Sequence, residues 1–450
     1  MTPGAQVAAA IDILTEIESG GRAADDAAAD YFRRRRFIGA KDRAQIAAHV
    51  YTALRHRAAI DWWIARIGKG AVAPAARSRV LTALVLVEGW RPGALAAACD
   101  GDRFRPVPLS PMEARLVDGL AGHTLRHPEM SRAVANDLPD WLLPYLAGAF
   151  GAGLEREMAA LNAAAPIDLR VNRLKTDRAG VCSALAAEGV AAEPTPLSPI
   201  GLRLKKRAPL SGLAAFREGL FEVQDEGSQI AALLADARPG MRVVDFCAGA
   251  GGKTLALAAA MGNRGKLVAC DVSSYRLERA ARRLRRAGVG NVERRVLSSE
   301  HDKWVKRHAA AFDRVLVDAP CLGTGTWRRN PDAKWRSQPR DLAELVERQQ
   351  QILRSAARLV RPGGRLIYAT CSLLREEDQA QAETFLGAHP DFVTYPIAKA
   401  WEETISGHYP GSSDFLSLTP ARHGTDGFFI AIFERRTANQ DSVVDDDQTG

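Results

Sequence analysis

The stretch that most constrains the fold is residues 241–254, where a short apolar run leads into a loop of small residues and then an Ala/Leu-rich segment. Val243 and Val244 are typical of a buried parallel strand. Glycines at 249, 251 and 252 let backbone amides approach a ligand closely. The stretch therefore predicts a strand, a turn and a helix that bind a nucleotide-like ligand at the end of the strand.

Two other glycine-rich motifs are excluded by the residues of this loop. A P-loop would need glycine at the position of Cys247, ahead of Gly252-Lys253-Thr254. A dinucleotide fingerprint would need a third glycine or alanine near Thr254. The loop alone does not identify the ligand further.

Composition sets broad limits on the protein. A length of 450 residues predicts two or three domains, and 61 Lys+Arg against 53 Asp+Glu favour an anionic partner. We expect no signal peptide and no membrane span, because neither pattern of apolar residues occurs. The six cysteines are far apart and lack metal-binding spacing, which indicates a reducing cytoplasm and no metal site.

The first two segments differ in pattern. Residues 1–145 predict an all-helical domain, with Val7, Ile11, Leu14 and Ile17 on one helical face. The run Arg33–Arg36 is either a solvated helix end or an RNA phosphate contact. Residues 146–222 predict a small α/β module, whose basic residues either protect a sheet edge or bind RNA.

From residue 223 to 437 the chain alternates strand and helix, which predicts a doubly wound, Rossmann-like parallel sheet. We expect strands near 242–246, 267–271, 292–297, 314–318 and 365–370, and a hairpin-like pair near 391–395 and 427–433. We expect helices at 226–235, 253–261, 274–287, 340–360 and 376–387. Residues 438–450 are predicted to be an acidic disordered tail.

Four reactive side chains follow predicted strands. Asp271 ends the second strand, where a carboxylate meets a ribose diol in this fold or simply caps the next helix. Asp318 and Cys321 follow the fourth strand, and Cys371 follows the fifth. Because ligands bind beyond the carboxyl ends of parallel strands, all four should lie on one rim with the glycine loop.

Four motifs in order resemble the Sun-family RNA cytosine-5 methyltransferases. They are Cys247-Ala-Gly-Ala-Gly-Gly-Lys-Thr254, Asp318-Ala-Pro-Cys-Leu-Gly-Thr-Gly325, Arg329-Asn-Pro-Asp332 and Tyr368-Ala-Thr-Cys-Ser372. The resemblance covers about 168–434. The helical N-terminus looks like the NusB-like RNA-binding domain of the bacterial members that methylate small-subunit ribosomal RNA.

The resemblance implies a class I methyltransferase domain, S-adenosylmethionine as cofactor, RNA as partner and a set of site residues. Cys371 is implied as the nucleophile and Cys321 as the residue that assists proton removal and product release, with Asp318 and Lys253 also in the catalytic pocket. DNA cytosine-5 methyltransferases instead use the cysteine of a Pro-Cys motif, which would nominate Cys321. The implied cofactor residues are Cys247, Ala248, Gly249, Ala250, Gly251, Gly252, Lys253, Asp271, Arg276, Ser298 and Asp318. The expected RNA contacts are Arg170, Asn172, Arg328, Arg329 and Lys334, with Trp327 and Trp335 as either stacking or packing residues.

One position departs from the family pattern. An acidic residue usually follows the third strand and contacts the adenine side of the cofactor, but here the strand runs into Ser298. Either the serine takes this position, or Glu300 or Asp302 substitutes.

We expect a cytoplasmic monomer acting on ribosomal RNA. The alternatives are a tRNA enzyme, a catalytically silent RNA-binding assembly factor, and an NAD-dependent oxidoreductase, which would leave both cysteine motifs unused.

Overall fold

The computed structural model describes residues 1–437, so the tail expected at 438–450 lies outside the described residues. The chain forms two compact units. Unit 1 comprises Met1–Ala164 and Thr326–Gln338, and unit 2 comprises Ala165–Gly325 and the chain from Pro339 onward. The expected boundaries at 145 and 222 stay a prediction. The inclusion of 326–338 in unit 1 was not expected from the sequence.

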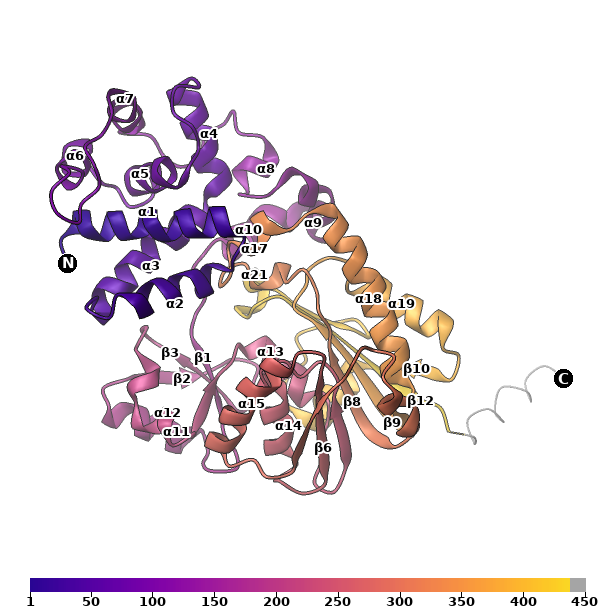
Figure 1. Ribbon diagram of the computed structural model, residues 1–450. Coiled ribbons are helices and arrows are strands. Elements are labelled where there is room, and N and C mark those ends of the chain that lie inside the picture. Colours follow the sequence, from indigo (N-terminus) through magenta and orange to yellow (C-terminus); the bar gives the residue numbers. More distant parts are fainter. Residues whose placement is uncertain (438–450) are drawn as a thin grey trace. The chain divides into compact units, whose positions relative to one another are not determined.

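Unit 1 is built from helices, as the sequence predicts for the N-terminal segment (Figure 1). They are α1 (Pro3–Gly20), α2 (Ala24–Arg34), α3 (Ala40–Arg55), α4 (Arg57–Gly68), α5 (Ala76–Leu86), α6 (Pro92–Ala98), α7 (Pro111–Leu120), α8 (Arg132–Ala135), α9 (Leu143–Phe150), α10 (Leu154–Leu161) and the inserted α17 (Ala333–Arg336). Within Met1–Ala164 the structure shows no strand.

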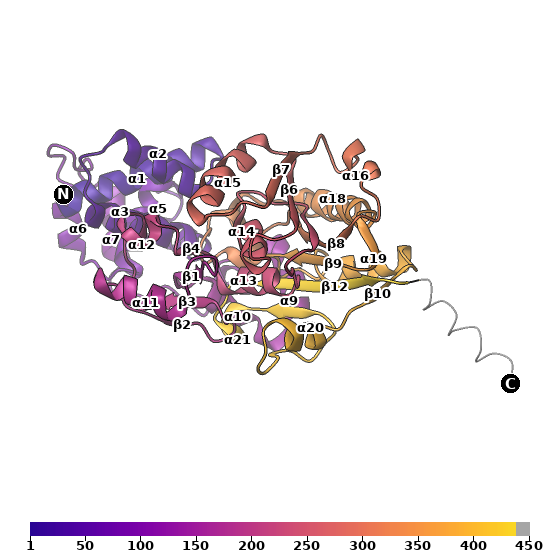
Figure 2. The same ribbon diagram turned by 90° about the horizontal axis from the view of Figure 1, so that it is seen from below.

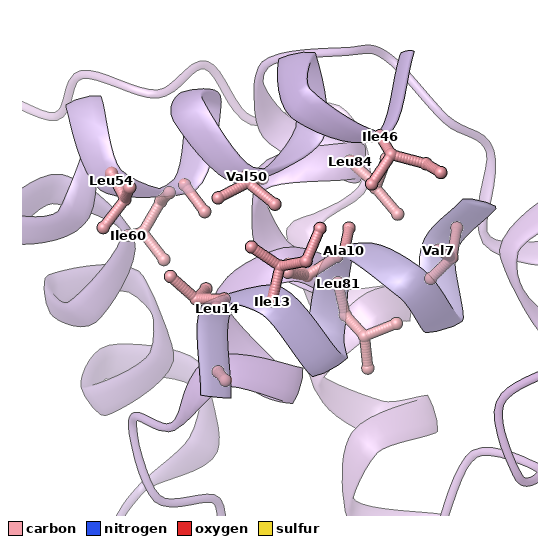
Figure 3. Close-up of a cluster of buried hydrophobic side chains, with 14 of the residues drawn as sticks. Val7, Ala10, Ile13, Leu14, Ile46, Val50, Leu54, Ile60, Leu81 and Leu84 are labelled. Carbon is pink, nitrogen blue, oxygen red and sulfur yellow. The ribbon is translucent and has the colours of Figure 1, made fainter. Parts of the chain in front are cut away.

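The core of unit 1 forms where the apolar faces of α1, α3 and α5 meet. Val7, Ile13 and Leu14 of α1 pack with Val50 and with leucines of α5 (Figure 3). These side chains recur three or four residues apart, so each helix presents one apolar stripe. Ile11, expected on the same face of α1, is only partly buried and packs at the margin of this core.

Unit 2 begins with a small antiparallel sheet in the order β2-β3-β1-β4. Its strands are β1 (Asp168–Val171), β2 (Ala192–Pro194), β3 (Gly201–Leu204) and β4 (Phe221–Val223), accompanied by α11 (Arg178–Ala187) and α12 (Ala214–Arg217). Leu169, Val171 and Phe221 of the sheet pack on Val181 and Leu185 of α11. The predicted α/β character of this segment is confirmed.

The larger sheet of unit 2 has the order β10-β12-β9-β8-β5-β6-β7, and β11 also pairs with β12. Its strands are β5 (Arg242–Asp245), β6 (Lys266–Asp271), β7 (Val292–Val296), β8 (Phe312–Asp318), β9 (Val360–Thr370), β10 (Phe392–Thr394), β11 (Leu416–Leu418) and β12 (Phe428–Arg435). β5 to β9 run parallel, whereas β12 is antiparallel to β9. The expected Rossmann-like sheet is confirmed, including the antiparallel pair at its edge.

Helices cover both faces of this sheet (Figures 1 and 2). One face packs on α16 (Lys303–Arg307), α18 (Pro339–Ala357) and α19 (Gln379–Ala388). The other packs on α13 (Glu226–Leu233), α14 (Gly252–Ala260) and α20 (Ile397–Thr404), with α15 (Ser274–Ala287) beside α14. Val243 and Val244 face opposite layers, which explains why the strand is apolar at successive positions. Among residues 1–437, no helix is both long and apolar enough to cross a membrane.

Candidate active site

The carboxyl ends of the central parallel strands bring the reactive side chains together. In the register of the sheet, Asp245 pairs with Leu316 of β8, and Asp318 pairs with Ala369 of β9. Strands β8 and β9 therefore end side by side, and Cys321 and Cys371 follow them. The rim predicted from the sequence is present.

The two cysteines are in direct contact. Their Sγ atoms lie 3.5 Å apart. The backbone N–H of Gly325 donates to the carbonyl oxygen of Cys371 at 2.9 Å, which ties the two cysteine loops together. The contact with Cys371 and desolvation raise the pKa of Cys321 well above that of a free thiol. Cys321 therefore retains its proton at neutral pH.

Lys253 lies against Asp318. Lys253 is in the first turn of α14 and is buried, and its Nζ atom is 2.7 Å from a carboxylate oxygen of Asp318. The same Nζ lies 5.1 Å from the centre of the Phe428 ring. The side chain of Asp318 is 33% exposed, so the carboxylate is held from the inside and remains open on its other side.

The glycine loop has a backbone that only glycine adopts easily. Gly249 and Gly251 have φ values of +53° and +78°. A Cβ atom at Gly251 would lie 2.9 Å from the Cβ of Ala280. The N–H of Gly249 donates to Asp271 at 2.8 Å, so this carboxylate fixes the loop while standing at the end of β6. The loop 247–252 is therefore a cradle of small residues held by the carboxylate of Asp271 at the end of β6.

Asp245, a buried polar residue under the loop, was not singled out from the sequence. Asp245 is fully buried at the end of β5, and Thr254 Oγ1 donates to it at 2.6 Å. Burial raises the pKa of Asp245 to about 7. Desolvation and the Asp245 and Asp318 carboxylates raise the pKa of Cys247 well above the usual value. Cys247 is therefore a neutral thiol beneath the cradle, unlike a nucleophile.

A carboxylate stands beside Ser298 after the third parallel strand. Both the N–H and the Oγ of Ser298 donate to Asp302, each at 2.9 Å. The backbone hydrogen bonds from Ser298 and Trp304 lower the pKa of Asp302 to about 2. Asp302 is therefore the carboxylate that lies against Ser298, four residues farther along the chain. Arg276 lies exposed in the first turn of α15.

Two expected RNA contacts are internal supports of unit 2. Arg170 is buried; it donates to the carbonyl oxygen of Gly252 at 2.7 Å and also to Gln224. Asn172 is buried and donates to the carbonyl oxygens of Gly219 and Ala287 at 2.8 and 2.9 Å. Both side chains attach the small sheet to helices α14 and α15. Because both side chains are buried and bonded within unit 2, they are a poor fit to the expected RNA contact.

Residues 326–338 are part of the helical unit. Lys334 is 1% exposed and donates to the carbonyl oxygen of Arg55 at 3.0 Å and to Asn162 Oδ1 at 2.8 Å. Trp335 Nε1 donates to the carbonyl oxygen of Leu54 at 2.6 Å, and Trp327 is buried. These two tryptophans are thus packing residues. Lys334 does not fit the expected phosphate contact, because its amine is used inside the unit.

The other two arginines of this segment differ in exposure. Arg328 is buried, and its carbonyl oxygen accepts a hydrogen bond from Arg55 at 3.1 Å. Arg329 is partly exposed. Burial makes Arg328 a poor fit to the expected RNA contact, whereas the exposure of Arg329 leaves that role a prediction.

Comparisons with known proteins give the same assignment as the motifs. A profile of the 16S rRNA methyltransferase RsmB/F family matches residues 232–434, and an RsmF/B-like ferredoxin-like domain matches residues 138–211. A probable ribosomal RNA small subunit methyltransferase B from Bacillus subtilis is 32% identical over 314 residues, 69% of each chain. The chain belongs to the RsmB/F family of 16S rRNA methyltransferases. This membership confirms the family resemblance and the fold class, and the family's description is that of a methyltransferase, the class of enzyme that the sequence predicts.

Further RsmB/F relatives and solved structures agree. A probable ribosomal RNA small subunit methyltransferase B from Synechocystis is 36% identical over 300 residues, and the match spans 66% of this chain and 66% of that relative's length. The crystal structure of PH0851 covers 97% of this chain and 99% of its own, with a TM-score of 0.79 and 28% identity. A methyltransferase homolog protein from Pyrococcus horikoshii covers 68% of this chain and 100% of its own, with a TM-score of 0.59 and 27% identity.

Proposed function

We propose that this protein transfers a methyl group to C5 of a cytosine in RNA through a covalent bond between Cys371 and C6 of the base. The observation that carries the proposal is the pair of thiols 3.5 Å apart at the ends of adjacent strands, beside the cradle and the Lys253–Asp318 pair. An NAD-dependent oxidoreductase would have no use for two thiols in contact.

The chemistry of cytosine requires the covalent step. C5 is a weak nucleophile until a thiolate adds to C6 and moves electron density to C5. S-adenosylmethionine, when bound, supplies an electrophilic methyl group to C5. A base then removes the C5 proton, the electron pair of that C–H bond restores the C5–C6 double bond, and the Cys371 thiolate leaves.

The two thiols can take different roles because they lie in contact. The contact with Cys371 and desolvation raise the pKa of Cys321. Two thiolates 3.5 Å apart would repel each other, so one sulfur can attack as the thiolate while the other keeps its proton. The resemblance to the Sun family assigns the addition to Cys371 and assistance with proton removal and product release to Cys321, and we adopt that assignment.

Asp318 is the group that would hold the base. Its partly exposed carboxylate can meet the N3 and N4 edge of a cytosine, while Lys253 fixes its inner side. The cytosine must leave its stack to reach this rim. Asp318 and the two thiols all lie at the ends of β8 and β9. A cytosine held by Asp318 would therefore present its C6 atom to Cys371.

The residues around the cradle fit the cofactor. The loop 247–252 would hold the methionine part, Asp271 the ribose, and Asp302 beside Ser298 the adenine side. Arg276, exposed in the first turn of α15, would face the same ligand.

We assign small-subunit ribosomal RNA as the substrate because the relatives in Bacillus subtilis and Synechocystis carry that description. We further propose that the enzyme acts as a cytoplasmic monomer. In a deletion strain, bisulfite sequencing of total RNA should show a single cytosine of this RNA losing protection. Loss at a tRNA position would assign the substrate to tRNA instead.

The roles of the thiols are tested with purified protein and RNA. Cys371→Ala should abolish both transfer of tritiated methyl groups and any protein–RNA adduct. Cys321→Ala should accumulate the adduct, because the bond to C6 forms but is not released. Cys182→Ala, in the small sheet module, is the matched control. An adduct in Cys371→Ala that is missing from Cys321→Ala would reverse the roles, and no methyl transfer by wild-type protein to any RNA would refute the proposal.

A further inference from the structure

Glu377 is a fully buried acid that belongs to none of the motifs described above. It lies between Cys371 and helix α19, and its side chain is 0% exposed. Burial raises the pKa of its carboxyl group above the usual value. A buried acid is costly unless its oxygens have partners, so the partners of Glu377 indicate why it is there.

The carboxylate of Glu377 contacts the loops of both cysteines. The N–H of Leu322, directly after Cys321, donates to its two oxygens at 3.0 and 3.3 Å. The hydroxyl of Ser372, directly after Cys371, donates to Oε2 at 2.6 Å. One side chain therefore fixes the residues that follow each thiol.

Gln349 of α18 completes this connection. Its Nε2 atom donates to Oε1 of Glu377 at 3.0 Å and to the carbonyl oxygen of Pro320 at 2.8 Å. Pro320 directly precedes Cys321, so Gln349 and Glu377 hold the backbone on both sides of that thiol. Gln349 is 0% exposed and its Oε1 atom has no hydrogen-bond partner. The amide thus contributes through its donor atoms, while its acceptor is left unpaired.

Additional bonds make the arrangement stiff. Ser372 Oγ lies 3.3 Å from Thr324 Oγ1, which accepts the N–H of Leu373 at 2.7 Å. The hydroxyl of Tyr368 donates to the carbonyl oxygen of Glu377 at 2.6 Å. The loop that carries Cys321 and the loop that carries Cys371 are therefore joined through buried hydrogen bonds, which are strengthened by the low local dielectric.

We propose that Glu377 and Gln349 are positioning residues for the reaction, which hold the Cys321 and Cys371 loops so that the two sulfur atoms stay in contact. The inference rests on the proposed function only for the use of the thiols; the connection itself is a property of the protein. Neither side chain acts on the base. Both act through backbone atoms of residues 320 and 322 and through the Ser372 hydroxyl.

The test measures the spacing of the thiols separately from catalysis. Phenylarsine oxide forms two As–S bonds, with loss of the two thiol protons and the arsenic-bound oxygen as water, and it needs both thiols close together. In wild-type protein it should bridge Cys321 and Cys371, as mass spectrometry of the full chain can show. Gln349→Met, which keeps the side-chain volume and removes both donated bonds, should slow capture and reduce kcat for methyl transfer by at least about tenfold. Its affinity for S-adenosylmethionine should stay unchanged by calorimetry.

Conservative replacement separates positioning from general stability. Glu377→Gln retains an acceptor for Leu322 and a donor for Ser372, so it should restore capture to near the wild-type rate, whereas Glu377→Ala should not. Gln351→Met, on the same helix with its amide 3.2 Å from the exposed Glu347, is the matched control and should behave as wild type. Should Gln349→Met fold poorly, the comparison of Glu377→Gln with Glu377→Ala decides.

Wild-type capture rates in both Gln349→Met and Glu377→Ala would overturn the inference. Slow capture in Glu377→Gln equal to that in Glu377→Ala would also overturn it, because the hydrogen bonds would then not be the cause. If wild-type protein is bridged but methylates no RNA, the proposed function fails while the spacing result still stands.

Discussion

The ammonium group of Lys253 lies 2.7 Å from the carboxylate of Asp318, with the lysine 7% exposed and the aspartate 33% exposed at their side chains. The two residues come from different parts of the sheet: the helix after β5 and the end of β8. Because Lys253 is shielded from solvent and Asp318 is partly open, the aspartate can bind a ligand while the lysine holds its carboxylate in place.

Lys253→Met should lower kcat/KM at least about tenfold, since Asp318 would lose the partner that holds its inner oxygen. Loss of one partner from a largely buried pair should also destabilise unit 2 by about 2 kcal/mol, less than for a fully buried pair because Asp318 is partly solvated. Methyl-transfer kinetics and urea unfolding measure the two effects. Adding Asp318→Asn to Lys253→Met should lower kcat/KM little further, because the pair is already broken. If the losses of the two single variants add in full, the two residues act independently.

Gly251→Ala should weaken binding of S-adenosylmethionine at least about tenfold. The residue has φ of +78°, and the added methyl group would lie 2.9 Å from the Cβ of Ala280. The left-handed backbone alone costs about 1–2 kcal/mol for alanine. Isothermal calorimetry gives the affinity, with Gly290→Ala as a control in open space. Equal affinities of the two variants would mean that the loop is not the cofactor cradle.

Asp302→Asn should reduce the affinity for S-adenosylmethionine more than Glu300→Gln does, because Asp302 is the carboxylate bonded to Ser298. Its pKa of about 2 keeps it ionised across the working pH range. The expected loss is about threefold to tenfold, the value of one hydrogen bond. Calorimetry on both variants measures these affinities. A larger loss of affinity in Glu300→Gln would assign the adenine side to Glu300.

Arg170→Met should lower the free energy of unfolding of unit 2 by about 2 kcal/mol, since a buried guanidinium loses its bonds to Gly252 and Gln224. The salt dependence of RNA binding should not change, because no phosphate contact is removed. Arg173→Met, at an exposed position close in sequence, serves as the comparison. If Arg170→Met instead reduces the slope of log K against log salt, Arg170 binds a phosphate after all.

Lys334→Met should change how the stability of unit 1 depends on pH. Burial lowers the pKa of Lys334 to about 7 in the folded protein, against about 10.4 in an unfolded chain. Between these values the unfolded state binds more protons, so this group makes wild-type stability rise as the pH increases from about 7 to 10. Lys334→Met should lack this rise, measured by urea unfolding at several pH values. Lys41→Met, at an exposed lysine, should keep it, and parallel curves for all three proteins would contradict the pKa.

The sequence determined the larger fold and the composition of the rim. Alternation of apolar strands and amphipathic helices from residue 223 onward places the strands within a few residues of β5 to β9, because such patterns are local. Since parallel strands end on one side, the positions of Asp271, Asp318, Cys321 and Cys371 followed from order alone.

Only the tertiary structure decided which basic and polar side chains are internal. Arg170 and Lys334 look like surface cations in the sequence, yet each is buried against carbonyl oxygens contributed by residues distant in the chain. Glu377 and Gln349 carry no motif, and their connection of the two thiol loops exists only because α18 packs against the ends of β8 and β9. Burial and hydrogen-bond partners depend on contacts between distant residues, and spacing along the chain does not encode them.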